Sequence, residues 1–153
     1  QAKLVTGLDS IVPSTSTPDY VCLKNFHRMA VVILVKNATT VTGSAITLKQ
    51  AKAVAGTSET ALAFATAMRN IDTAAADLLS AFTVTSNTFT TDSTNSKNLM
   101  YVIDVRPEML DHENGFDCVR AGTGDATAAT VTVLYVMYPK NTVDGQPPSA
   151  IID

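Results

Sequence analysis

The sequence predicts an all-β protein, an antiparallel β-sandwich of jelly-roll-like type with extended N-terminal and C-terminal arms. Three observations predict this class: apolar and polar residues alternate over short segments, turn residues separate these segments at spacings of about ten residues, and no helical pattern alternates with the strands. The chain has 153 residues, of which 46% are hydrophobic, so a single domain can bury a core without a disulfide or a metal. The predicted organisation is an arm over 1–19, a sandwich domain over 20–138 and an arm over 139–153.

The N-terminal arm is predicted from Pro13 and Pro18, which flank a run of Ser and Thr residues. Proline donates no backbone hydrogen bond, so this stretch cannot continue a sheet and is expected to be extended. Residues 19–23 have the pattern of a short strand, and a turn over 24–27 precedes a strand over 28–36. The latter strand is apolar on both of its faces, which predicts a central position in a sheet.

The middle of the chain contains one clear strand and one ambiguous segment. Residues 44–54 alternate apolar with polar side chains, which predicts a strand. The Ala and Leu content of the following segment favours helix, whereas its alternation favours strand. We predict a strand over 61–69 and a short helical turn over 73–79. Residues 83–98 are predicted to begin as a Thr-rich strand and to end as a polar loop.

The last third of the chain is predicted to hold three strands. Residues 99–106 alternate again, and the strand stops at Pro107. Two further segments, 116–120 and 127–138, are separated by a glycine-containing loop over 122–125 and are predicted to pair as a hairpin. The last of these strands is apolar on both faces, which predicts a second central strand. Prolines then begin the C-terminal arm.

Charge and composition exclude several function classes. The chain has 11 Lys and Arg against 14 Asp and Glu, a net charge of −3, and no basic cluster of the kind that binds nucleic acid. The longest apolar run, Met29–Val35, is too short to cross a bilayer, and the first residues lack the pattern of a secretory signal. Only 16% of residues are charged, which favours a surface that packs against other protein.

The titratable residues give no strong chemical signal. The histidines are His27 and His112, and neither has the spacing of a metal site. Residues 111–113 with Asp117 form the densest acidic patch, and carboxylates beside an imidazole are able to ligate a cation or to carry acid–base chemistry. Because these residues belong to one turn, we predict a solvated turn instead. The sequence therefore predicts no catalytic residue, no cofactor, no metal, and a protein that is not an enzyme.

Three other sets of residues are interpreted as structural. Gly122 and Gly124 lack the strand-to-helix context of a phosphate-binding loop and are assigned to a hairpin loop. Arg106 and Arg120 are cations at strand ends that are expected to pair with Asp104 or Asp117 across a sheet. The two cysteines, Cys22 and Cys118, are expected to be buried thiols, and a disulfide between them is the less favoured alternative.

Several segments together resemble small virion proteins of tailed bacteriophages. The resemblance covers most of the chain in order and is carried by residues 24–27, 83–105, 114–120 and 147–153. It implies a capsid cement or decoration protein that binds the exterior of an icosahedral shell and is made in the cytoplasm of the host bacterium. It also implies two partners, the major capsid protein and further copies of the chain as a dimer or trimer, with no nucleic acid and no membrane.

Two expectations about function follow from this resemblance. The first is that the chain stabilises the lattice of the major capsid protein, with much of the contact made by residues 1–19 and 139–153. The alternative is a head-fibre or tail-associated sandwich that binds a receptor or a carbohydrate through loops at one end. Binding sites of the second kind usually present exposed aromatic side chains, and this sequence has no Trp.

Overall fold

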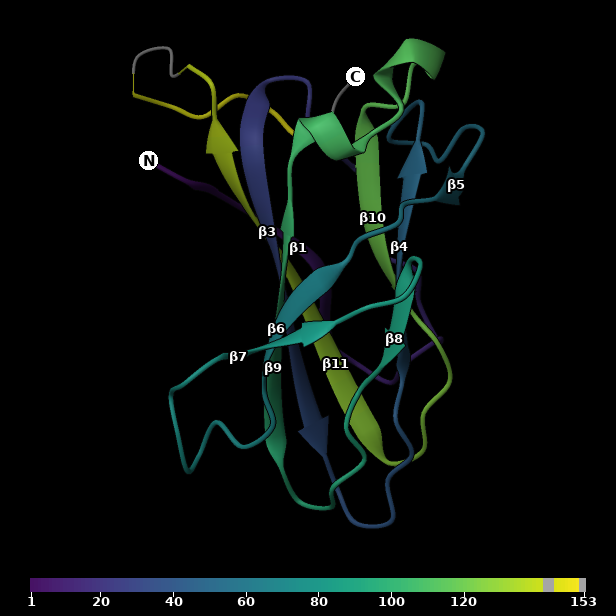
Figure 1. Cartoon of the computed structure of the whole chain (residues 1–153), viewed down its shortest axis with the longest axis vertical. Helices are drawn as coiled ribbons and strands as arrows, with labels where there is room; N and C mark the ends of the chain where they lie inside the picture. The colour runs from purple at the N-terminus through teal and green to yellow at the C-terminus, as the bar shows by residue number, and fades with distance from the viewer. Residues whose placement is uncertain (142–144, 152–153) are drawn as a thin grey trace.

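The structure is a computed structural model that describes residues 1–141 and 145–151, and it confirms the predicted all-β sandwich. Two antiparallel sheets pack together, with β3, β9 and β11 in one layer and β4, β8 and β10 in the other (Figure 1). Residues 142–144 and 152–153 of the predicted C-terminal arm lie outside the described residues. No helix among the described residues is long and apolar enough to cross a membrane.

The larger sheet has six strands in the order β1-β11-β3-β9-β6-β7. Its long strands β3, β9 and β11 alternate in burial over most of their length, with a buried residue at every second position. The bounds are β1 (Lys3–Ile11), β3 (Phe26–Asn37), β6 (Thr66–Asn70), β7 (Ser80–Thr83), β9 (Asn98–Val105) and β11 (Ala129–Pro139).

The smaller sheet has five strands, and β4 is its most connected member. The order is β2-β10-β4-β5, and β8 also pairs with β4. The bounds are β2 (Val21–Cys22), β4 (Ala45–Ala51), β5 (Thr60–Ala61), β8 (Thr88–Thr90) and β10 (Cys118–Thr123). Two 3-10 helices, η1 (Pro107–Met109) and η2 (His112–Asn114), connect β9 to β10. Jelly-roll connectivity in the strict sense stays a prediction.

The core lies between the two sheets and is built from the inward-facing side chains of their central strands. β3 contributes Met29, Val31, Ile33 and Val35, which are at most 2% exposed. The hydroxyl of Tyr135 on β11 reaches across the core and accepts a hydrogen bond from the Ala121 N–H on β10 at 3.1 Å. Because β10 and β11 belong to opposite sheets, this bond ties the two layers together.

Both predicted central strands occupy central positions. β3 pairs with β11 and β9, and β11 pairs with β1 and β3. The predicted hairpin between the last two strands is wrong, however, since β10 pairs with β2 and β4 in the other sheet. The residues between the end of β10 at Thr123 and the start of β11 at Ala129 therefore carry the chain from one layer to the other. Local turn residues indicate that the chain reverses direction, but they do not indicate which strand becomes the neighbour.

Two local predictions in the middle of the chain also need correction. The expected continuous strand over 61–69 is interrupted, because the chain leaves the smaller sheet after β5 and enters the larger one at β6. Leu62 and Phe64 are buried at this crossing. The helical turn predicted over 73–79 is reduced to a single turn in which the N–H groups of Ala75 and Ala76 bond to the Asp72 carbonyl.

The predicted N-terminal arm over 1–19 is largely part of the sandwich. Residues 3–11 form β1, which pairs with β11 at the edge of the larger sheet. Pro13 and Pro18 are buried, so the chain that follows β1 packs on its own domain. At the other end, Ala150 is fully buried and its carbonyl accepts a hydrogen bond from the Cys22 N–H at 2.7 Å. The described parts of both predicted arms are therefore anchored to the domain.

Replacing Gly43 with alanine is expected to destabilise the fold by about 1–3 kcal/mol. A Cβ at this position would lie 2.2 Å from the Thr91 carbonyl oxygen, which is backbone and cannot rotate away. Gly122→Ala is the matched control, because its Cβ would meet only the Thr47 carbonyl oxygen at 3.8 Å, and it should stabilise by about 0.4–1 kcal/mol. Urea denaturation measures both changes, and equal midpoints for the two variants would contradict the packing described here.

Candidate functional site

The most extended surface feature is the solvent-facing side of the six-stranded sheet, which we call the outer face. Its central row crosses all six strands, from β1 to β7, and consists of Thr6, Leu134, Val32, Val102, Met68 and Ala81. An antiparallel sheet with one solvated side ordinarily alternates apolar residues inward with polar residues outward. In this row, every residue after the first is apolar, although each is exposed or partly exposed.

The rows on either side extend the apolar surface. One contains Leu4, Val136, Ala30 and Asp104, and the other contains Thr132, Leu34 and Met100. Leu4 is 63% exposed and Leu34 is 37% exposed. The ten apolar positions of these three rows, spaced about 4.8 Å apart between strands and about 6.8 Å apart along a strand, make a patch of roughly 300 Å². Apolar patches of this size on a monomer often mark a place where another molecule packs.

The charged groups of the outer face lie at its ends. Asp104 bonds to Arg28 at 2.6 Å and lies 3.5 Å from Arg106. Lys36 lies toward the opposite end of β3, beside a shallow hollow of about 270 Å³ that Leu34, Thr130 and Thr132 also line. The middle of the outer face therefore presents side chains that gain free energy when another apolar surface removes them from water.

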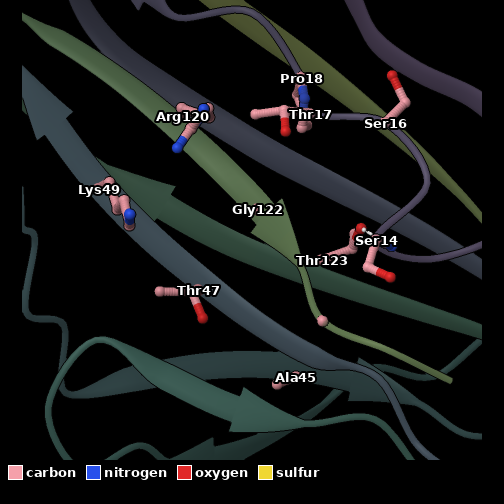
Figure 2. Close-up of a pocket in the computed structure, with 11 residues that line it drawn as sticks. Ser14, Ser16, Thr17, Pro18, Ala45, Thr47, Lys49, Arg120, Gly122 and Thr123 are labelled. Carbon is pink, nitrogen blue, oxygen red and sulfur yellow. Dashed lines mark hydrogen bonds between the residues drawn. The ribbon is translucent and has the colours of Figure 1, made fainter. Parts of the chain in front are cut away.

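A second feature lies on the solvent-facing side of the smaller sheet, where residues 14–18 run beside β10 on the side away from β4 (Figure 2). Between this segment and the sheet is an open pocket of about 260 Å³, which we call the 14–18 pocket (Figure 2). Ser14 holds the segment in place, since its N–H donates to Thr123 Oγ1 at 3.2 Å and its hydroxyl donates to Asp125. The lining consists of Ser14, Ser16, Thr17, Pro18, Ala45, Thr47, Lys49, Arg120, Gly122, Thr123 and Gly124.

Lys49 and Arg120 lie directly opposite each other on β4 and β10 at one end of this pocket (Figure 2). Like charges in facing positions repel, and Glu59 compensates by pairing with both cations. Lys49 Nζ lies 2.5 Å from Glu59 Oε1, and Arg120 Nη2 lies 2.9 Å from Glu59 Oε2. The Tyr20 hydroxyl also donates to Glu59 Oε2, at 2.9 Å. Two positive charges therefore share one carboxylate.

These contacts shift the pKa values of the group. The hydrogen bonds from Lys49 and from Tyr20 hold the pKa of the Glu59 carboxyl below its ordinary value. Burial and the hydrogen bond to Glu59 raise the pKa of Tyr20 well above its ordinary value. The Arg120 guanidinium lies 4.8 Å from the centre of the Tyr20 ring, and its side chain is 16% exposed. Arg120 is thus held in place by both an ion pair and a ring contact.

Replacing Glu59 with glutamine should lower stability at neutral pH and have little effect in acid. A carboxyl whose pKa is lowered by folding stabilises the protein above its unfolded pKa of about 4.3, and this contribution is lost as the pH falls through the folded pKa. Because Glu59 is 38% exposed, solvent screening limits the effect to less than about 1 kcal/mol. Urea denaturation of both proteins at neutral pH and in strong acid measures it. An equal difference at both pH values would rule out a charge effect.

The histidines and the acidic turn do not converge on a site. His27 contacts the Pro139 carbonyl oxygen with Nδ1 at 3.2 Å, and His112 Nδ1 lies 2.7 Å from Asp117 Oδ1. Residues 111–115 are exposed, which fits the prediction of a solvated turn. Within residues 1–141 and 145–151, no three His, Cys, Asp or Glu side chains are placed to hold a metal ion.

The structure changes the interpretation of the other predicted residues. Arg106 lies 3.5 Å from Asp104, but the two belong to the same segment of chain and do not pair across the sheet. Arg120 pairs with Glu59 and not with Asp117. Gly122 belongs to β10, and Gly122 and Gly124 line the 14–18 pocket. The sequence pattern gave no sign of this pocket, because its walls come from three segments that are far apart in the chain.

The two cysteines face each other on neighbouring strands. Cys22 on β2 is directly opposite Cys118 on β10, and both are buried. They form a small cluster with Tyr20 and Ala51 on the outer side of the smaller sheet.

Together, the fold and its surfaces define a β-sandwich protein with one apolar sheet face and one polar pocket on the opposite layer. Comparison with protein families, with curated proteins and with solved structures finds no match for the chain.

Proposed function

We propose that the chain is a structural virion protein that binds the outer surface of an icosahedral phage capsid and stabilises the lattice of the major capsid protein. The observation that carries the proposal is the outer face, whose central row from Leu134 to Ala81 is apolar although it faces solvent. A non-enzymatic structural role also suits a chain in which only 16% of residues are charged. The resemblance to small virion proteins is the reason for proposing a phage capsid as the assembly that the chain binds.

The contact is proposed to be made mainly by the outer face. Residues 3–11 pair with β11 and Ala150 is buried, so these parts of the predicted arms hold the domain together. The outer face, in contrast, is a broad surface that needs no reordering before it binds. A preformed surface avoids the entropy cost of ordering a flexible arm.

Stabilisation of the shell follows from preferential binding. A protein that binds the assembled lattice better than free subunits adds its binding free energy to the stability of the lattice. Flat surfaces are suited to bridging neighbouring capsomers, and a symmetric dimer or trimer of the chain would place equivalent faces over equivalent sites. The proposed jelly-roll-like topology is supported by the way strands alternate between layers along the chain, with β1, β3, β9 and β11 in one and β2, β4 and β10 in the other.

A direct test mixes the purified chain with empty shells assembled from the major capsid protein alone. We expect saturable binding at high copy number and a higher melting temperature of the shell. Free major capsid protein subunits serve as the control, because the proposal requires weaker binding to them. Absence of the chain from pelleted shells, or binding that leaves the melting temperature of the shell unchanged, would refute the proposal.

The alternative is a head-fibre or tail-associated sandwich that binds a carbohydrate. The 14–18 pocket favours this alternative, because several hydroxyl groups line it. They belong to Ser14, Ser16, Thr17, Thr47 and Thr123. The pocket lining contains no aromatic side chain, however, and sugar rings commonly pack on aromatic rings. Copy number on the particle separates the two functions, because a fibre or tail component is present at few positions.

A further inference from the structure

We propose that the 14–18 pocket binds an acidic side chain carried by an extended peptide segment of a partner protein. Only the origin of that segment, a neighbouring protein in the assembly, rests on the function proposed above. The pocket lies on the layer opposite to the outer face, so the same subunit would contact one neighbour through each side. Three features of the pocket support this occupant: its charge, its hydroxyl groups and the glycine in its floor.

The charge of the pocket favours an anion. Lys49 and Arg120 line it, whereas no Asp or Glu does. Glu59 pairs with both cations from outside the lining, so the group formed by Lys49, Arg120 and Glu59 carries a net charge of +1. Asp125 is at the opposite end, where it accepts the hydroxyl hydrogen of Ser14. A single carboxylate placed beside Lys49 would complete the pairing of two positive with two negative charges.

The hydroxyl groups of the pocket suit a peptide backbone. Ser16 and Thr17 are exposed and make no hydrogen bond within the described residues. Thr47 on the facing strand shares a hydrogen bond with Thr88 Oγ1 at 3.1 Å. Hydroxyls both donate and accept, so they are able to bond to the N–H and C=O groups of an extended segment. The pocket therefore offers polar partners beyond the two cations.

The glycine at position 122 is the strongest indication that another molecule occupies the pocket. It lies within β10, opposite Thr47, where glycine weakens a strand. Neither backbone conformation nor packing requires glycine there, because its φ is not in the left-handed region and an added Cβ would have a single neighbour, at 3.8 Å. The other six glycines have such a reason: a positive φ at Gly56, Gly115 and Gly145, and a Cβ contact of 3.0 Å or less at Gly7, Gly43 and Gly124.

A glycine that the fold does not need leaves the floor of the pocket open. Glycines inside strands often mark the close approach of a ligand or of another backbone. We infer that the backbone of the bound segment passes over Gly122 while its carboxylate reaches Lys49 and Arg120. A larger side chain at position 122 would fill that space without disturbing the sheet, which makes this residue the best site for a test.

The test titrates isotope-labelled protein with capped Ala-Glu-Ala and with capped Ala-Gln-Ala, and follows the backbone amide signals by NMR. We expect Ala-Glu-Ala to shift the signals of Thr47, Gly122 and Thr123 and to bind about tenfold more tightly than Ala-Gln-Ala, because a charge-assisted pair is lost in the amide. Binding should weaken progressively from Gly122 to Gly122→Ala to Gly122→Val. Lys49→Gln should remove the preference for glutamate, while Lys36→Gln, on the other layer, should retain it.

Several results would overturn the inference. Equal affinity for the two peptides would exclude recognition of a carboxylate, and unchanged affinity in a folded Gly122→Val protein would exclude the pocket. If acetate binds as tightly as Ala-Glu-Ala, or glucose binds more tightly, the occupant is not a peptide segment. If Gly122→Val does not fold, Lys49→Gln still decides the question of charge. These titrations contain no shell, so their failure leaves the capsid-binding proposal standing, and the reverse also holds.

Discussion

Replacing Tyr135 with alanine is expected to destabilise the protein by about 3–5 kcal/mol, a large part of the roughly 5–15 kcal/mol that stabilises a domain of ordinary size. The ring is fully buried between the two sheets. It also packs closely on β1, because a Cβ on Gly7 would lie only 2.7 Å from Tyr135 Cε2. Removal of the ring would therefore open a cavity that borders three strands, β1, β10 and β11.

Tyr135→Phe separates the hydroxyl from the ring. It keeps the ring but leaves the Ala121 N–H without its acceptor at 3.1 Å, and loss of a partner for a buried donor costs about 1–3 kcal/mol. Urea denaturation monitored by circular dichroism measures both variants. A cost for Tyr135→Ala no larger than that for Tyr135→Phe would contradict the account of the ring as a major part of the core.

Replacing Leu134 with glutamate is expected to abolish shell binding while leaving the protein folded. Leu134 lies in the central row of the outer face, beside Val32 on the neighbouring strand. In the free protein the new carboxylate stays in water, so the change in stability should be within about 1 kcal/mol. At an interface it would be buried without a partner, and we expect affinity to fall by about 100-fold or more.

Thr85→Glu is the matched control for Leu134→Glu. Thr85 is exposed, follows the edge strand β7 and is not part of the central row. It adds the same charge, so any general repulsion between the protein and the shell affects both variants equally. Co-sedimentation with empty shells measures the affinities. Equal binding by the two variants would show that the outer face is not the contact surface.

The strands that the sequence predicted well are those whose pattern is local. β3, β9 and β11 are runs of largely apolar, often β-branched residues that end at turn residues, and this local pattern specifies a strand without knowledge of the neighbours. Residues 3–11, which form β1, were predicted to belong to an extended arm, because Pro13 and Pro18 cannot continue a sheet. Both prolines lie after the strand and therefore do not interrupt it. The crossing at Leu62 and Phe64 was missed because its alternation continues while the chain changes sheets.

The surfaces of interest depend on pairings that are distant in the chain. The apolar character of both faces of β3 was visible, and it correctly indicated a central strand. The sequence alone does not show that Val32 lies between Val102 and Leu134 on the outer face, because these neighbours are set by the register of three strands. The pairing of Arg120 with Glu59 is likewise set by the path of the chain from β4 through β5, and not by any spacing between charges.

The most direct test of the central claim is an electron cryo-microscopy reconstruction of the particle that contains this chain. The account predicts density for the sandwich repeated at high copy over the exterior of the shell. It further predicts that the outer face, with Val32, Val102 and Leu134, lies against the major capsid protein. Density confined to a single vertex or to the tail, or an outer face turned toward solvent, would contradict the account.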